Sequence, residues 1–216
     1  MRKYLYLAAV AASAAVLALP ATSADAAGHV LTISKTGGTA VKVGAVLKSG
    51  LASGTKAVFA FGTQKLTCKS ATISATVKTN PVKPGTATES LTAATVSKCT
   101  VNVANITFKS FKVKNLPYKV SVSDAAGFPV KISGQSKKKP ILVTVNVSLN
   151  GTPFSCSYKA ASISGHASNT GNTVAFSKQK LTKSSGANCP ASANFSATFG
   201  PVTDSSVTGS PKVFVN

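Results

Sequence analysis

The sequence predicts an all-β protein, built either as one antiparallel β-sandwich or as two related β-sandwich halves, with two disulfides. Three observations lead to this fold class. Apolar residues alternate with polar ones at a period of two, no segment sustains the 3.6-residue period of a helix, and turn-forming residues separate the alternating segments. Many short strands with turns at roughly 8–12-residue spacing are typical of sandwich folds.

Each predicted strand is a segment in which alternation or β-branched enrichment extends over the length of a strand. Among the turn signals, Asn150-Gly151 is the sharpest, because both residues tolerate the positive φ that a type I′ hairpin requires. The predicted strands are Val30–Ile33, Ala40–Leu47, Ala57–Phe61, Thr72–Val77, Val101–Phe108, Tyr118–Val122, Val130–Ile132, Ile141–Leu149 and Thr173–Phe176. The other turn signals are Gly37-Gly38, Ser53-Gly54, Asn80-Pro81, Pro84-Gly85, Asp124–Gly127 and Gly200-Pro201.

The cysteines are even in number, which fits disulfide formation in an oxidising compartment. Four cysteines allow three pairings. The spacing favours Cys68–Cys99 with Cys156–Cys189, because these pairs enclose nearly equal intervals of 31 and 33 residues. A Cys₄ zinc site is the competing chemistry, but such sites bring their ligands in close C-x₂₋₄-C pairs, and this sequence has none.

The equal intervals also suggest an internal repeat. A shift of 90 residues places Leu91-Thr92 on Leu181-Thr182 and Cys99 on Cys189. Composition offers the alternative explanation, because β-proteins rich in Ser, Thr and Val align with themselves. The predicted regions are a signal peptide at 1–26, a first β half at 27–134, a Lys-rich loop or linker at 135–140 and a second β half at 141–216.

The N-terminus is typical of a secretory signal peptide, with Arg2 and Lys3 before an apolar stretch, Tyr4–Leu19, and an A-x-A cleavage site at Ala24–Ala26. Cleavage would leave 22 lysines and no arginine against three acids, a net charge of +19. No later segment approaches the length of about 18 apolar residues that a membrane helix needs. We therefore expect a protein that is secreted and stays extracellular or associated with the cell wall.

Catalytic residues are scarce in the mature chain. The acids are Glu89, Asp124 and Asp204, and the histidines are His29 and His166. A Ser-His-Asp set could be assembled on paper from His166 and Asp204 or Asp124, but no G-x-S-x-G elbow supports it. Neither an acidic cluster nor a glycine-rich phosphate loop is present. We expect no metal, no cofactor and no enzymatic activity.

Lysines are the remaining candidates for a binding site. Spread positive charge attracts polyanions at long range, although lysine also keeps secreted β-proteins soluble and protects strand edges. Sequence-specific nucleic-acid binding is disfavoured, because the mature chain lacks arginine and tryptophan. The predicted polyanion-binding residues are those at the two local maxima of lysine density, Lys109, Lys112, Lys114 and Lys119, and Lys137, Lys138 and Lys139.

Nearly the whole mature chain resembles a group of secreted actinobacterial proteins known mainly by their signal sequence. This resemblance implies export and supplies neither an activity nor site residues. The segments that carry it are Gly37–Val41, Leu51–Thr55, Pro84–Ser90, Asn115–Tyr118, Leu181–Gly186, Pro201–Asp204 and Val213–Asn216.

A shorter stretch, Thr39–Thr55 together with Asp124–Gly127, is similar to the immunoglobulin-like apoproteins that carry enediyne chromophores. That likeness implies an immunoglobulin-like sandwich that carries a small ligand. Those proteins close short disulfide loops and are acidic, whereas the intervals here are 31 and 33 residues and the mature charge is +19.

These observations favour a non-enzymatic protein that binds anionic extracellular or cell-wall polymers. Two other classes stay open. One is an adaptor of a secreted protein assembly, joined through exposed edge strands such as Val30–Ile33 and Val213–Val215. The other is a small-ligand carrier, which would need a pocket of roughly several hundred Å³ between its sheets.

Overall fold

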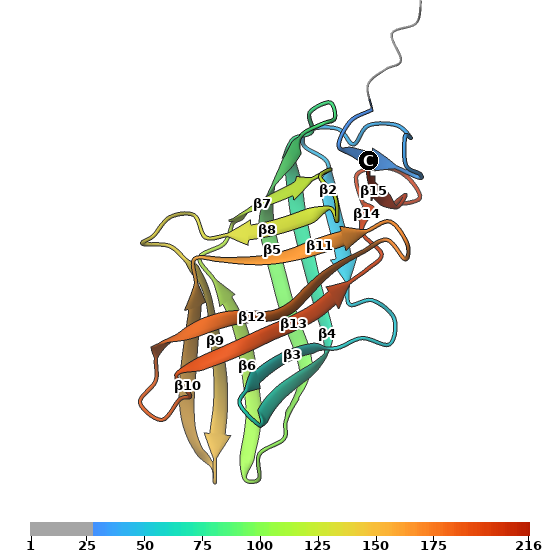
Figure 1. The fold of residues 1–216 in the computed structure, drawn as a ribbon. Helices are drawn as coiled ribbons and strands as arrows, with labels where there is room; N and C mark the ends of the chain where they lie inside the picture. The colour runs from blue at the N-terminus through green and yellow to red at the C-terminus, as the bar shows by residue number, and fades with distance from the viewer. Residues whose placement is uncertain (1–27) are drawn as a thin grey trace, which may run out of the picture.

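A computed structural model describes residues 28–216, in which all regular secondary structure is β-strand (Figure 1). The predicted signal peptide, residues 1–26, lies outside these described residues. The prediction of an all-β antiparallel fold with two disulfides is confirmed. The strands are β1 (Leu31–Ile33), β2 (Val46–Gly50), β3 (Ala57–Phe61), β4 (Gln64–Thr79), β5 (Thr86–Val101), β6 (Ile106–Lys114), β7 (Tyr118–Ser123), β8 (Pro129–Ser133), β9 (Ile141–Leu149), β10 (Thr152–Ala160), β11 (Ser162–Ser168), β12 (Thr173–Ser185), β13 (Ser192–Phe199), β14 (Thr203–Asp204) and β15 (Val213–Val215).

The predicted sandwich is wrong, because the main sheet closes on itself. Its hydrogen-bonded order runs β11-β8-β7-β5-β4-β3-β13-β12, and β12 pairs in turn with β11. This closure makes an eight-stranded antiparallel barrel, with no gap at which two separate sheets could begin. The apolar residues of alternate positions point inward and form its core, as period-2 alternation requires.

Two local features of β12 and β11 allow the closure. A bulge between Phe176 and Gln179 bends β12, so that its first residues pair with β11 and its last residues pair with β10. Opposite it, β11 carries Gly165, where an added Cβ would lie 2.3 Å from the Ala175 carbonyl oxygen and 2.8 Å from the Phe176 ring. Only glycine therefore lets β11 approach β12 closely enough to complete the ladder.

Besides β2, which pairs with β4, and β14, which pairs with β2, three strands extend the sheet beyond the ring. β10 pairs with β12, β9 pairs with β10, and β6 pairs with β9 and ends the row. Figure 1 shows these strands in the lower part of the molecule and β7, β8 and β11 in the upper part, with the long β4 and β5 running through both. The regions 27–134 and 141–216 thus share one sheet through β6–β9, β8–β11 and β3–β13, and residues 135–140 form a turn within it.

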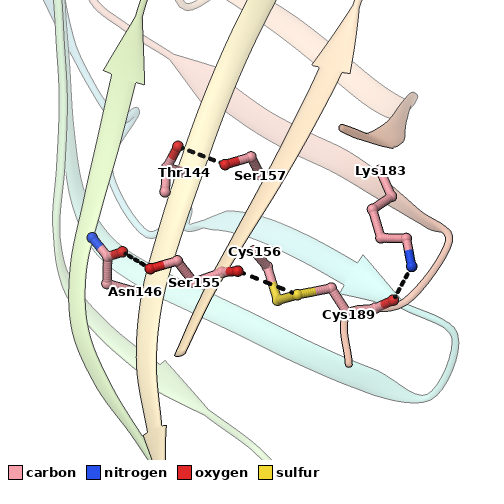
Figure 2. Close-up of a disulfide and its surroundings, with 7 residues drawn as sticks. All are labelled: Thr144, Asn146, Ser155, Cys156, Ser157, Lys183 and Cys189. Atoms are coloured by element: carbon pink, nitrogen blue, oxygen red, sulfur yellow. Dashed lines mark hydrogen bonds between the residues drawn. A yellow bond between two sulfur atoms is a disulfide. The ribbon is translucent and has the colours of Figure 1, made fainter. Parts of the chain in front are cut away.

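Both disulfides join the cysteines that the spacing favoured. Cys68 and Cys99 lie directly opposite each other on β4 and β5. Cys156 of β10 is bonded to Cys189 in the loop after β12, and the Lys183 ammonium donates a hydrogen bond to the Cys189 carbonyl at 3.2 Å (Figure 2). All four cysteines are in disulfides, so none of them is available as a thiolate ligand for the Cys₄ zinc site considered above.

The terminal segments are not exposed edges. β1 and β15 pair with each other in a small separate sheet, and Val30, Leu31, Val213 and Val215 are all buried. The Asn80 side chain holds this sheet to the body, accepting from Leu31 N at 2.8 Å and donating to the Leu31 and Val41 carbonyls. The prediction that these segments are free to add a partner's strand is therefore wrong.

Individual strand predictions had mixed outcomes. The Asn150-Gly151 turn is confirmed: both residues have positive φ, 48° and 86°, and join β9 to β10 with Leu149 opposite Thr152. The predicted strand Val101–Phe108 is wrong, since β5 ends at Val101 and β6 begins at Ile106 after a turn that places Asn105 at φ 63°. The predicted strand Ala40–Leu47 is also displaced, because β2 begins at Val46.

Candidate functional site

The outer face of β5, β7 and β8 carries a shallow groove of about 760 Å³, which we call the lysine groove. Side chains alternate between the barrel interior and this outer face, so the same strands supply apolar residues inward and polar residues outward. Lys78, at the end of β4, borders the groove on one side. The outward-facing residues that line it are Lys78, Thr88, Ser90, Lys119, Ser121, Lys131 and Ser133.

The strand registers place lysines and hydroxyls next to one another. Ser90 of β5 lies opposite Lys119 of β7, which in turn lies opposite Ser133 of β8. In the adjacent row, Ser121 of β7 lies opposite Lys131 of β8. The lysines of β7 and β8 therefore occupy different rows, which avoids the repulsion of like charges directly across a ladder.

This arrangement suits an anionic ligand. Lys78, Lys119 and Lys131 are all exposed, so their ammonium groups stay hydrated and adaptable point charges. Serine and threonine hydroxyls between them can donate hydrogen bonds to phosphate, sulfate or carboxylate oxygens. No arginine lines the groove, so no planar guanidinium group requires a particular ligand geometry. Binding should therefore depend mainly on the charge density of the ligand.

Of the predicted polyanion-binding residues, only Lys119 lines the lysine groove. Lys109, Lys112 and Lys114 are exposed on β6, the last strand of the row, where Lys109 falls at a bulge between Phe108 and Ser110. Lysines and bulges of this kind protect a free strand edge from pairing.

Lys137, Lys138 and Lys139 lie in the exposed turn between β8 and β9, closed by a hydrogen bond from Lys139 N to the Ser136 carbonyl at 3.0 Å. Two hydrogen bonds connect this turn to the β6–β7 connection: Gln135 Nε2 donates to the Asn115 carbonyl at 3.1 Å, and Asn115 Nδ2 donates to the Pro140 carbonyl at 3.0 Å. Because Gln135 also lines the lysine groove, the Lys-rich turn lies beside one end of it.

Two groove lysines were missed by sequence reasoning. Lys131 is the polar residue between Val130 and Ile132, and Lys78 follows the buried Val77. Each is an isolated lysine in an alternating strand, and neither raises the local lysine density. What the two lysines share is an outward-facing position in an alternating strand. That position identifies a groove residue only when the order of the neighbouring strands is known.

The acids do not neutralise the groove from its outer side. The Asp124 carboxylate accepts from Gly85 N at 2.9 Å, and the buried Asp204 accepts from Ser206 N at 2.9 Å, so both serve the local backbone. Glu89 contacts the groove from the inward-facing series of β5, and burial raises its pKa to about 7. Among the described residues that line the groove, the one carboxylate, that of Glu89, stands against the three lysines Lys78, Lys119 and Lys131, so the groove keeps a net positive charge.

Among the residues that the structure describes, no hydrogen bond joins the histidines to the acids considered for catalysis. His29 makes a hydrogen bond to the Asn80 carbonyl through Nδ1 at 2.7 Å, and His166 is exposed on β11 opposite Pro129 and Ala175. Within residues 28–216, no group of three or more His, Cys, Asp or Glu side chains could hold a metal ion. No helix in this described part of the chain is long and apolar enough to cross a membrane.

Comparisons of the chain with family models, with curated proteins and with solved structures gave no match. The resemblances noted in the sequence therefore stay predictions, and the functional argument depends on the residues and their geometry.

Proposed function

We propose that this protein is a secreted, non-enzymatic binding protein that associates with anionic extracellular or cell-wall polymers through the lysine groove. The observation that carries the proposal is the grouping of Lys78, Lys119 and Lys131 with serine and threonine hydroxyls around a hollow of about 760 Å³. An extended anionic chain can place successive charged groups against successive lysines along such a hollow.

Charge supports the same reading. The mature net charge of +19 gives the whole surface a positive potential, which raises the encounter rate with polyanions. The groove then provides a place where the ligand's charges and hydroxyls can be held together. The Lys-rich turn, residues 137–139, extends the positive surface at the end marked by Gln135.

Two further observations agree with a binding role outside the cell. The two disulfides are compatible with an extracellular location, since such bonds persist in oxidising compartments. The carboxylates of Asp124 and Asp204 are engaged with backbone amides, which leaves them poorly placed to act as general acid or base.

The adaptor alternative loses its structural basis at the termini, because β1 and β15 pair with each other and their outer edges are engaged as well. Val41 N donates to the Leu31 carbonyl, and Val213 N donates to the Val202 carbonyl. Strand β6 keeps a free edge, but its exposed lysines and its bulge disfavour the addition of a partner's strand.

The proposal is tested by isothermal titration of the purified protein with poly(glycerol phosphate) and with heparin, using neutral dextran as the control. We expect both anionic polymers to bind at 50 mM salt and dextran not to bind, because hydrated lysines discriminate charge rather than polymer structure. Absence of binding to either polyanion at low salt would refute the proposal and leave the lysines as a device for solubility and edge protection.

A further inference from the structure

The barrel interior contains a cavity of about 80 Å³ on the opposite side of β5 and β7 from the lysine groove. Most of its wall is aliphatic, with Leu91 of β5, Val120 of β7 and Ile132 of β8 among the lining residues. One water molecule needs only about 10–15 Å³ of such a cavity. The space is therefore large enough for several water molecules or one small ligand. The polar residues of its wall include Ser49, Ser168 and Asn169, whose side chains make hydrogen bonds to the backbone, as well as Lys48 and Thr173. Glu89 and Asn172 are the other two polar residues that line it.

Asn172 supplies an acceptor that no residue among 28–216 satisfies. Its side chain is only 4 % exposed, and its Nδ2 donates to the Val213 carbonyl, which fixes the orientation of the amide. Its Oδ1 is buried without any hydrogen-bond partner. Buried acceptors of this kind are rare in folded proteins, and each requires an explanation, such as a bound molecule.

Glu89 supplies a second acceptor. It belongs to the inward-facing series of β5 with Ala87 and Leu91, and its cross-strand neighbours are Val77 and Val120, all of them apolar. Burial raises its pKa to about 7. The other charged residue at this cavity is Lys48 of β2, which is exposed, while Lys78, Lys119 and Lys131 face the groove outside.

A second interior cavity of about 90 Å³ adjoins the first. It is lined by apolar and aromatic side chains, and it shares Ile73, Leu91, Ile132 and Phe176 with the first cavity. The two spaces together therefore have one end that carries hydrogen-bond acceptors and one end that is apolar throughout. A ligand that fits both ends has a compact donor group and a short hydrocarbon tail.

We propose that the barrel interior is a binding site for a small primary amine with an apolar tail, held by Glu89 and Asn172. An ammonium group has three N–H donors and no acceptor, which matches two acceptors in a mostly aliphatic wall. An alcohol has one donor, so it can satisfy only one of them. A carboxylate ligand would face two acceptors and be rejected. The site shares Glu89 with the lysine groove but takes a ligand of the opposite charge, so the two proposals are tested with different ligands.

The test uses n-hexylammonium as the probe, 1-hexanol as its neutral match and hexanoate as its anionic match, in calorimetric and ligand-observed NMR titrations at pH 8. We expect the amine to bind at least about tenfold more tightly than the alcohol, and hexanoate not to bind in the cavity. Glu89→Gln keeps the side chain's shape and should reduce the preference to less than about twofold. Asp124→Asn, which removes a carboxylate outside the cavity, should leave the preference unchanged.

The pH dependence provides a second readout. The amine stays protonated throughout, so its affinity follows the ionised fraction of Glu89 and should be about tenfold lower at pH 6 than at pH 8. Equal affinity for amine and alcohol, no binding of the amine at millimolar concentration, or an undiminished preference in Glu89→Gln would each overturn the proposal. None of these results bears on polymer binding, which is measured with ligands of the opposite charge.

Discussion

Removing two lysines from the lysine groove should change how polymer binding depends on salt. Each lysine–anion contact releases counterions, and the logarithm of affinity falls by about 0.7–0.9 per contact for each tenfold rise in salt. With Lys78, Lys119 and Lys131 all engaged, affinity should drop by about 20- to 40-fold between 50 and 200 mM salt. In Lys119→Ala/Lys131→Ala, one groove contact remains, and the same salt change should cost only about threefold.

The assay is a salt series by isothermal titration with poly(glycerol phosphate), carried out on the wild type, the groove variant and a matched control. Lys65→Ala/Lys180→Ala is a suitable control, because it removes the same charge from exposed lysines of β4 and β12 that do not line the groove. The control should keep the steep wild-type salt dependence. If the two variants reduce the slope equally, binding depends on spread charge, and the groove is not the site.

Four further predictions concern the turn, the fold and the interior. Neutralising Lys137, Lys138 and Lys139 together should weaken polymer binding without changing Tm, because the turn is exposed and its closing hydrogen bond uses backbone atoms; a lowered Tm by calorimetry would contradict this. Burial raises the pKa of Glu89 from 4.5 to about 7, so between these pH values the folded protein retains a proton that the unfolded chain releases. The free energy of unfolding should therefore fall by about 3 kcal/mol as the pH rises from 4.5 to 7. Denaturant titrations should find this decline absent from Glu89→Gln, and a decline that persists there would assign it to other groups. Cys156→Ala/Cys189→Ala opens a 33-residue loop and should lower the unfolding free energy by about 3–4 kcal/mol in urea titrations, whereas an unchanged value would mean that the unfolded chain is already compact. Gly165→Ala should cost about 1–3 kcal/mol, because its Cβ would overlap the Ala175 carbonyl at the closure, and wild-type stability in the same titration would show that β11 can move away.

The strands that alternation predicted best are those with large inward residues. In β9, Ile141, Val143, Val145 and Val147 are all buried, and the predicted and observed bounds coincide. In β5, by contrast, the inward positions include Ala87 and Glu89, and the outward ones are Ser and Thr. A segment of Ala, Ser and Thr has too little apolar contrast to be distinguished from a loop, so only pairing with β4 and β7 makes it a strand.

Closure of the sheet could not be predicted for a different reason. It depends on β11 pairing with β8 on one side and β12 on the other, contacts that no local pattern specifies. Gly165 is one local sign of it, since an isolated glycine within a strand marks a close approach of backbones. The disulfide pairing could be predicted from the nearly equal spacing, although only Cys68–Cys99 joins two consecutive strands, β4 and β5.

The sequence predicted that lysines form the candidate site, but of the lysines it named only Lys119 lines the groove. Density along the sequence identifies lysines that are neighbours in the chain, as in residues 137–139, whereas the groove gathers lysines from β4, β7 and β8. Lys119 and Lys131 are 12 positions apart in the sequence and in adjacent rows of the same strand pair. A polyanion site on a sheet is therefore a property of strand order, and strand order here follows from the closure.

The lysine groove and the interior cavity depend on one shared register. In β5, Glu89 lies opposite Val120 and faces inward, while the next residue, Ser90, lies opposite Lys119 and faces outward. A slip of β7 by one residue relative to β5 would exchange the two faces of β7, exposing its valines and bringing Lys119 into the apolar interior. The cost of burying that lysine makes the observed register far more stable than the slipped one. The same alternation that secures the fold thus separates the charges, leaving acceptors inside for a cation and ammonium groups outside for an anion.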